Sequence, residues 1–93
     1  MRTEADLRAI HEFSHRHREL LARSERAGCF HCCAVFDPSE IRYWVDSREP
    51  QTGALEVGVT ATCPRCGIDA VLPSAAPLPW DATLLGDMRS RWF

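Results

Sequence analysis

The first part of the chain carries a stripe of mostly apolar residues with the period of an α-helix. Its positions recur at steps of three and four residues: Leu7, Ile10, Phe13, His17, Leu20 and Leu21. This spacing places them on one helix face. Thr3 and Asp6 can form a capping box at the start, and Gly28 stands where a glycine often ends a helix. The pattern predicts one long helix over residues 4–26.

The middle of the chain shows patterns typical of short strands and one helix start. Residues 34–36 predict a short strand, and Asp37, Pro38 and Glu40 have the order of a helix N-terminus. A short helix there would place Ile41, Trp44 and Val45 on one side. Residues 55–61 alternate between apolar and polar positions, which predicts a half-buried strand. The apolar run 68–72 fits a strand or a helical turn equally well.

The C-terminal pattern predicts a second helix over residues 81–93. Three prolines mark a loop over residues 73–79, and Asp81 is a good helix start. The apolar stripe of this helix is Leu84, Leu85, Met88 and Trp92. Because aromatic residues close the chain, we expect this helix to dock onto the rest of the protein. Together these elements predict an α+β fold.

Two Cys-x-x-Cys pairs carry the strongest chemical signal. The first knuckle (residues 28–32) contains Cys29 and Cys32, and the second knuckle (residues 63–67) contains Cys63 and Cys66. Each pair turns two thiolates toward one point, and Zn²⁺ prefers four ligands in a tetrahedron. The gap between the pairs exceeds the usual zinc-ribbon spacing of about 15–20 residues. We therefore expect one structural Zn²⁺ in a Cys₄ core over residues 28–72, with a substructure folded between the pairs.

This core should have a treble-clef-like or double-knuckle form within a single zinc-binding domain over residues 1–93. A chain of 93 residues is long enough for one domain. A structural metal offsets the limited apolar core of so small a protein. Four protein ligands fill the zinc tetrahedron and leave no position for water, so the site should be structural and not catalytic.

The other chemistries of paired cysteines fit less well. Disulfides suit secreted chains, and a redox Cys-x-x-Cys normally occurs once at a helix start. An iron–sulfur cluster is disfavoured by the Pro and Gly around the second pair and by the lack of a further cysteine run. Cys33 is an additional cysteine. It could replace Cys32 as a ligand, although a small buried residue or a free thiol is the commoner role.

Charge bears on the partners that this protein could bind. The formal net charge is −2 and becomes more negative once four thiolates and one divalent ion are counted. A nonspecific nucleic-acid binder is usually basic. Arginines on the polar face of the first predicted helix, together with one on the second knuckle, are nevertheless candidate nucleic-acid contacts: Arg16, Arg23, Arg26 and Arg65.

One further motif suggests catalysis, and we discount it. His11, Glu12 and His15 match the H-E-x-x-H pattern of zinc metalloproteases. Such a short pattern arises easily by chance, and this chain is too short to build a substrate cleft around two zinc sites. The sequence therefore leaves an enzymatic role uncertain and disfavoured, with no catalytic residue and no small-molecule substrate identified.

The sequence also predicts where the protein works. Its N-terminus is too acidic for a secretory or transit signal. No apolar run approaches the roughly 20 residues that cross a bilayer. Reduced thiols in a zinc-type pattern then indicate the cytoplasm and no membrane partner.

Four motifs in combination resemble a known family. They are GCFxC at 28–32, FxPxEIxxW at 36–44, CPxCGID at 63–69 and LxxMxxxWF at 85–93. This set resembles a family of small bacterial zinc-knuckle proteins that are usually labelled only "cytoplasmic protein". The resemblance implies a fold and a location, and no activity. The chain departs from the family in Cys33 and in a longer loop over residues 47–57.

A more distant resemblance is to the treble-clef core of HNH endonucleases. Those enzymes carry a catalytic His between the knuckles, and residues 34–62 of this chain contain no His. The resemblance therefore implies a catalytically dead relative. We expect a non-catalytic module that binds another protein in bacterial defence or regulation. The alternative is a nucleic-acid-binding zinc protein related to such inactive nucleases.

Overall fold

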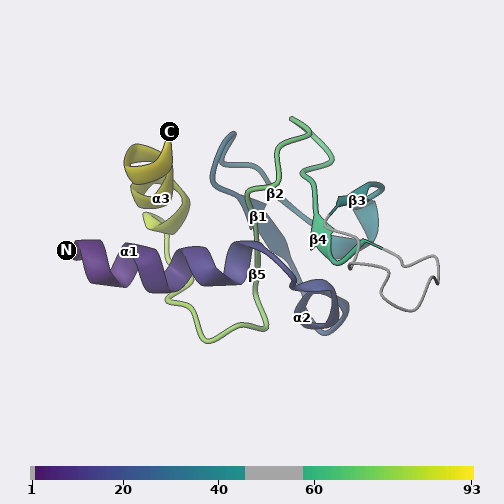
Figure 1. Cartoon of the computed structure of the whole chain (residues 1–93), viewed down its shortest axis with the longest axis horizontal. Coiled ribbons are helices and arrows are strands. Elements are labelled where there is room, and N and C mark those ends of the chain that lie inside the picture. Colours follow the sequence, from purple (N-terminus) through teal and green to yellow (C-terminus); the bar gives the residue numbers. More distant parts are fainter. Residues whose placement is uncertain (1, 46–57) are drawn as a thin grey trace, which may run out of the picture.

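The computed structural model describes residues 2–45 and 58–93, and their arrangement is the predicted mixture of helices and small sheets (Figure 1). The helical elements are α1 (Glu4–His11), η1 (Glu12–Ser14), α2 (Arg18–Ala22), η2 (Pro38–Glu40) and α3 (Leu84–Trp92). The strands are β1 (Ala27–Cys29), β2 (Val35–Phe36), β3 (Trp44–Val45), β4 (Thr60–Ala61) and β5 (Val71–Pro73). None of the helices in these described ranges is long and apolar enough to cross a membrane.

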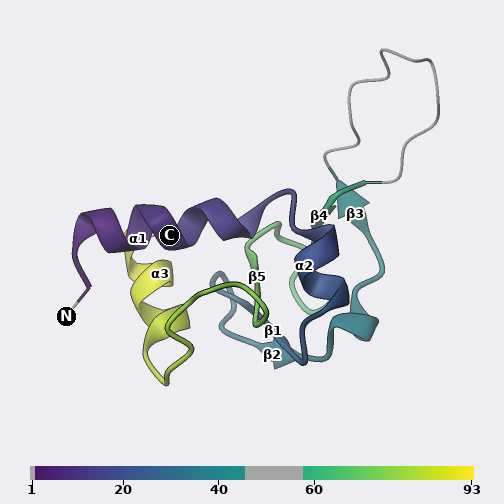
Figure 2. The same ribbon diagram turned by 90° about the horizontal axis from the view of Figure 1, so that it is seen from below.

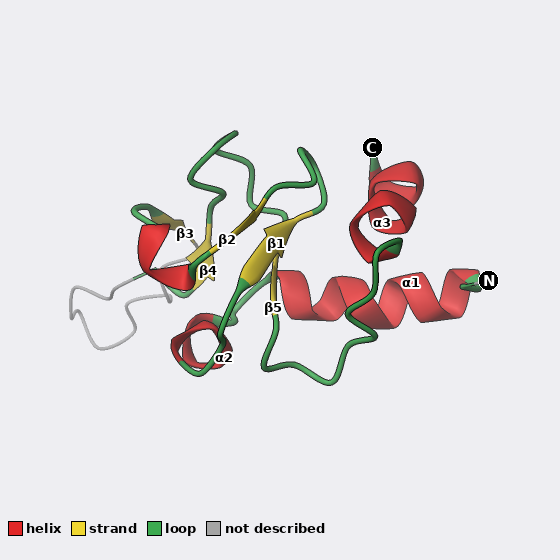
Figure 3. Cartoon of the chain, turned by 180° about the vertical axis from the view of Figure 1, so that it is seen from behind, coloured by secondary structure: helices red, strands yellow, loops and turns green. Residues whose placement is uncertain are grey.

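The strands form two antiparallel sheets with the order β2-β1-β5 and β3-β4. Figures 1 and 2 both place α1 and α3 side by side at one end, with α2 and the β3-β4 sheet at the other. The three-stranded sheet lies between them, as Figure 3 shows from behind. Its strands bring the first knuckle (β1) close to the chain that follows the second knuckle (β5).

The predicted long helix over residues 4–26 is wrong. Its start is confirmed, because Thr3 and Asp6 form the capping box. However, α1 ends at His11, and after η1 the chain becomes extended at His15 and takes a positive φ of 50° at Arg16. The helix then restarts as the short α2, and Gly28 lies within β1 and does not end a helix.

Contacts with a distant segment explain this break. The Arg16 N–H donates to Thr60 Oγ1 (2.8 Å), and the Arg18 N–H donates to the Val59 carbonyl (3.2 Å). These bonds take the place of intrahelical i→i−4 bonds at the same donors. Ser14 Oγ also donates to the His11 carbonyl (2.6 Å), a local bond that competes with helix continuation.

His17 fastens the broken segment to the second sheet. Its side chain is 1% exposed. Nδ1 lies 2.7 Å from the Phe13 carbonyl, and Nε2 lies 3.1 Å from the Ala61 N–H of β4. Because a carbonyl only accepts and an N–H only donates, the ring is neutral with its proton on Nδ1. Burial lowers the pKa of His17 from its ordinary value.

This lowered pKa predicts a pH dependence of stability. Unfolding returns His17 to an ordinary pKa of about 6.5. Below that pH the unfolded chain binds a proton that the folded chain does not, so stability falls as pH drops through about 6.5. It levels off below the lowered pKa of the folded state. In urea titrations between pH 8 and 5, His17→Gln should lose less stability than the parent chain. Any pH dependence that the cysteine thiols cause is common to both proteins and cancels in this comparison. Stability that falls equally with pH in His17→Gln and in the parent chain would therefore contradict the prediction.

The C-terminal helix docks as predicted, although it is shorter than residues 81–93. Leu84 and Met88 are fully buried, and Leu85 and Trp92 pack against the same core. The His11 ring packs against Trp92 at a tilt of 42°, with the ring centroids 4.2 Å apart. These contacts join α1 to α3.

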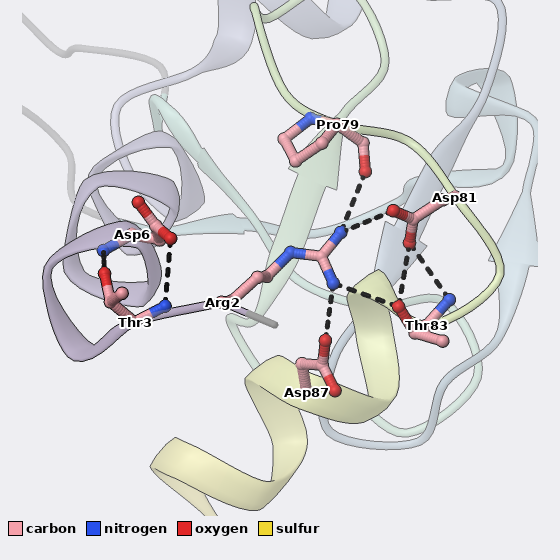
Figure 4. A network of polar contacts seen from close by, with 7 residues as sticks. All are labelled: Arg2, Thr3, Asp6, Pro79, Asp81, Thr83 and Asp87. Carbon is pink, nitrogen blue, oxygen red and sulfur yellow. Dashed lines mark hydrogen bonds and ion pairs between the residues drawn. The ribbon is translucent and has the colours of Figure 1, made fainter.

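An arginine at the start of the chain strengthens this junction, and no sequence pattern indicated it. Arg2 hydrogen-bonds Thr83 and Asp87 through one guanidinium nitrogen, and Asp81 and the Pro79 carbonyl through the other (Figure 4). Its guanidinium lowers the pKa of Asp81. Asp81 in turn accepts from Thr83 and caps the turn before α3.

We expect Arg2→Lys to lower the melting temperature by a few degrees. Lysine keeps the charge but loses the planar fork that serves four acceptors at once. Arg2 is 12% exposed in its side chain, so its bonds are partly shielded from water. The control is Arg8→Lys, because Arg8 is 70% exposed and forms one ion pair, with Glu4. Equal effects of the two substitutions on thermal unfolding would contradict this role of Arg2.

The central segment differs from its sequence pattern in two ways. Asp37 and Glu40 form the expected capping box, but only the single turn η2 follows. Ile41 is buried, whereas Trp44 enters strand β3, where the Arg18 guanidinium lies 4.2 Å from its ring centroid. The predicted short helix is therefore wrong.

Two other predictions for strands have different outcomes. Of the strand expected over residues 55–61, Thr60–Ala61 form β4, and residues 55–57 lie outside the described ranges, as does the loop 47–57. The run 68–72, which fitted two structures, ends in strand β5.

Candidate metal centre

The two knuckles share one backbone conformation. In the first, the Cys33 N–H donates to the Cys29 carbonyl (2.7 Å). In the second, the Gly67 N–H donates to the Cys63 carbonyl (2.9 Å). Cys33 and Gly67 therefore occupy equivalent positions, and both have a positive φ, of 63° and 81°. A tight turn of this kind directs the two cysteine side chains of each pair to the same side.

Backbone N–H groups are aimed at the sulfurs in the same way in both knuckles. The His31 N–H donates to Cys29 Sγ and the Arg65 N–H donates to Cys63 Sγ, each at 3.3 Å. An N–H that points at a sulfur stabilises its thiolate form. The chain thus supplies partial positive charge where a metal-bound thiolate would need it.

The four sulfurs lie at the corners of a compact group. All four Sγ atoms lie within 4.8 Å of one another. Cys29 and Cys66, one from each knuckle, are 3.7 Å apart, and so are Cys32 and Cys63. A tetrahedral site with metal–sulfur bonds of about 2.3 Å requires neighbouring sulfurs about 3.8 Å apart. The observed separations fit this value, so these four residues could hold a metal ion.

The cysteines are not disulfides. None of the five forms a disulfide, and 3.7 Å is far longer than a sulfur–sulfur bond of about 2.05 Å. In residues 2–45 and 58–93, no other group of three or more Cys, His, Asp or Glu side chains converges in this way. The structure thus brings together the four residues that the sequence singled out.

Burial makes this group costly without a cation. Cys29 is fully buried and Cys63 is 3% exposed. Burial raises the pKa of the Cys29 thiol. Burial also acts to raise the pKa of Cys63, but N–H groups of Cys66 and Arg65 and the neighbouring thiols outweigh it, so this pKa is lowered. A divalent ion would stabilise all four thiolates, because a coordinated thiol is deprotonated outright.

Cys33 does not belong to the group. It is exposed, and its sulfur is not one of the four that lie within 4.8 Å of one another. Its role as a buried residue or as a substitute for Cys32 is therefore wrong, and the free thiol remains. Aligning the knuckles as CFHCC and CPRCG would have indicated this, because Cys33 then matches the turn position of Gly67.

The H-E-x-x-H residues do not form a site. His11 ends α1, whereas His15 lies beyond η1 in extended backbone. The two rings are therefore not one helical turn apart, as the protease motif requires. His11 instead packs between Trp92 and Phe30, with its ring centroid 5.9 Å from that of Phe30.

The four arginines do not share a helix face. Arg16 lies in the break after η1, Arg23 ends α2, and Arg26 precedes β1. Arg65 lies on the second knuckle and pairs with Glu40 at 3.0 Å. All four are exposed, but the long helix that would have aligned three of them does not exist.

Comparison with known proteins adds no relative. No protein-family model, no curated protein and no solved structure matches this chain. Its function is therefore inferred from the cysteine group and the surfaces around it.

Proposed function

We propose that this chain is a zinc protein in which Cys29, Cys32, Cys63 and Cys66 hold one structural Zn²⁺. The observation that supports this most directly is the pair of 3.7 Å sulfur separations, which match a tetrahedral tetrathiolate site. Four thiolate ligands favour zinc over hard cations such as Ca²⁺ and Mg²⁺, because those cations prefer oxygen ligands. The Pro and Gly around the second pair and the lack of a further cysteine run favour zinc over an iron–sulfur cluster.

The proposed metal acts by holding the fold together. Four thiolates complete the coordination of zinc, so no position remains for a water that could react. The ion would tie the first knuckle, in the β2-β1-β5 sheet, to the second knuckle, which follows the β3-β4 sheet. The sheets have only two or three residues per strand, so such a link would supply stability that their hydrogen bonds do not.

Counting reactive thiols tests the site. In the protein as purified, one thiol per chain, Cys33, should react quickly with iodoacetamide, because the other four are bound to metal. After denaturation with a chelator, all five should react. Intact-mass spectrometry reads both numbers, and elemental analysis should find about one zinc per chain. Five fast-reacting thiols without chelator would contradict the proposal, and iron with visible absorption would replace zinc with an iron site.

We further propose that the folded chain is a non-catalytic module that binds another protein, in the cytoplasm and in a defence or regulatory setting. The closed thiolate site supports the absence of chemistry at the metal. Large apolar side chains on the surface support a partner: Val35, Tyr43, Val45 and Phe93 are between 39% and 74% exposed. In capture experiments, the immobilised zinc-loaded chain should retain a partner protein, and the control Cys63→Ser should not. Binding of the purified partner to the zinc-loaded chain should then be saturable.

Nucleic-acid binding is the weaker alternative. Arg16, Arg23 and Arg26 lie on separate segments, and Arg65 is already paired. Fluorescence anisotropy with labelled single- and double-stranded DNA and RNA at low salt tests it. Affinity that falls steeply with salt, and falls again in Arg23→Gln, would support this alternative; no binding would remove it.

A further inference from the structure

A hollow next to strand β2 has the features of a peptide-binding site. The β2 hollow has a volume of about 520 Å³, and its lining includes Arg26, Cys33, Val35, Trp80, Asp81 and Leu85. Its lining residues come from the edge of the β2-β1-β5 sheet and from the start of α3. Figure 3 shows this sheet in yellow and α3 in red. Three properties of its lining define what could fill it.

The first property is an incompletely covered sheet face. Val35, Gly28 and Leu72 are direct cross-strand neighbours, so their side-chain positions lie on one face. Leu85 and Trp80 cover Gly28 so closely that a Cβ there would lie 2.9 and 3.1 Å from them. Leu72 is fully buried, whereas Val35 remains 54% exposed. This face of the sheet is therefore covered at β1 and β5 but not at β2. An apolar side chain from another molecule could cover Val35.

The second property is an open strand edge. The Cys29 N–H donates to the Ala34 carbonyl, which makes Gly28 and Val35 a pair that is not hydrogen-bonded to each other. The N–H and carbonyl of Val35 therefore point away from β1, to the outer edge of the sheet. The neighbouring outward positions are already occupied, because the Cys33 N–H donates to the Cys29 carbonyl and the Asp37 N–H donates to the Glu40 carboxylate. An added strand could therefore form about two hydrogen bonds, one with the N–H and one with the carbonyl of Val35.

The third property is one uncompensated charge. Asp81 is neutralised by Arg2. Arg26 is exposed, and among residues 2–45 and 58–93 no carboxylate forms an ion pair with it. The lining therefore attracts a negative group at its rim and an apolar group on its floor.

We propose that the β2 hollow binds an extended segment of a partner protein that carries a large apolar residue next to an acidic one. The segment adds to the edge of β2. The residue opposite Val35 places its side chain on Trp80 and Leu85, and the acidic residue pairs with Arg26. Two backbone bonds and one apolar side chain give weak, reversible binding, typical of transient contacts.

A displayed library of random dodecapeptides, selected on the immobilised zinc-loaded chain, tests this site. Enriched peptides should contain an apolar residue with an Asp or Glu close by. By fluorescence anisotropy, Val35→Glu should weaken binding of such a peptide at least about tenfold. The control Ala22→Glu introduces the same charge at an exposed position of α2, outside the lining of the hollow, and should leave binding unchanged. Selection on Arg26→Glu should enrich Lys or Arg in place of the acidic residue.

Each other result would overturn the assignment. Peptides that bind Val35→Glu as well as the parent chain would leave the protein-binding role intact and remove the β2 hollow. No enrichment on a correctly metallated chain would likewise remove the β2 hollow. The proposed protein-binding function, on which this inference rests, is tested separately by the capture experiment. Concentration-dependent dimers that Val35→Glu abolishes would show that a second copy of the chain occupies the hollow.

Discussion

We expect Cys63→Ser to lose the zinc ion and, with it, the cooperative folded state. Cys63 is almost fully buried, and its sulfur lies 3.7 Å from that of Cys32 in the proposed metal site. Structural zinc contributes about 10 kcal/mol or more of apparent binding energy, which in a small domain is folding energy. The whole stability of such a domain is only about 5–15 kcal/mol. With three thiolate ligands in place of four, the remaining zinc-binding energy is therefore too small to keep the domain folded.

The measurements are zinc per chain and unfolding in urea followed by tryptophan fluorescence. Zinc should fall from about one per chain to near zero, and the sigmoidal transition should be replaced by a gradual slope. Cys33→Ser is the matched control, since it makes the same change at an exposed cysteine outside the sulfur group. It should keep both the zinc and the transition. A cooperative transition at the same urea concentration in Cys63→Ser would show that the metal is dispensable.

We expect His17→Ala to lower the free energy of unfolding by about 3–5 kcal/mol. The side chain is 1% exposed and joins two segments that are 44 positions apart, through Phe13 and Ala61. Alanine leaves a cavity, a buried N–H of Ala61 without a partner, at a cost of about 1–3 kcal/mol, and a partly buried Phe13 carbonyl without one. The segment between η1 and α2 would lose the side chain that joins it to strand β4.

His15→Ala is the control for this substitution, because His15 is an exposed residue in the same segment. It should change the free energy of unfolding by less than about 0.5 kcal/mol. If His17→Ala leaves no folded protein to measure, His17→Gln can keep one of the two bonds and should unfold at an intermediate urea concentration. A similar small loss for His15→Ala and His17→Ala would contradict the role of the buried imidazole.

Features encoded by short stretches of sequence could be predicted. Two capping boxes, at Thr3–Asp6 and at Asp37–Glu40, form as expected because each depends on four consecutive residues. The stripe of α3 faces the core where its period places it: Leu84 and Met88 are buried, and Leu85 and Trp92 are half-buried against the core. The convergence of four cysteines also followed from spacing, because each Cys-x-x-Cys turn orients its own pair of thiols and a tetrahedral ion needs two such pairs.

Features decided by distant contacts could not be predicted. The period of residues 7–21 fits a continuous helix, and nothing near Arg16 shows that Thr60 and Val59 bond its segment. Trp44 fits a helix face as well as a strand, and pairing with Ala61 decides for the strand. The Arg2 network joins positions up to 85 apart in the sequence, so no local pattern could reveal it.

X-ray absorption at the zinc edge tests the central claim most directly. The purified chain, never exposed to a chelator, should give a first shell of four sulfurs at about 2.3 Å with no oxygen or nitrogen neighbour. A sample without zinc, or a first shell with oxygen or nitrogen in place of any of the four sulfurs, would contradict the closed tetrathiolate site.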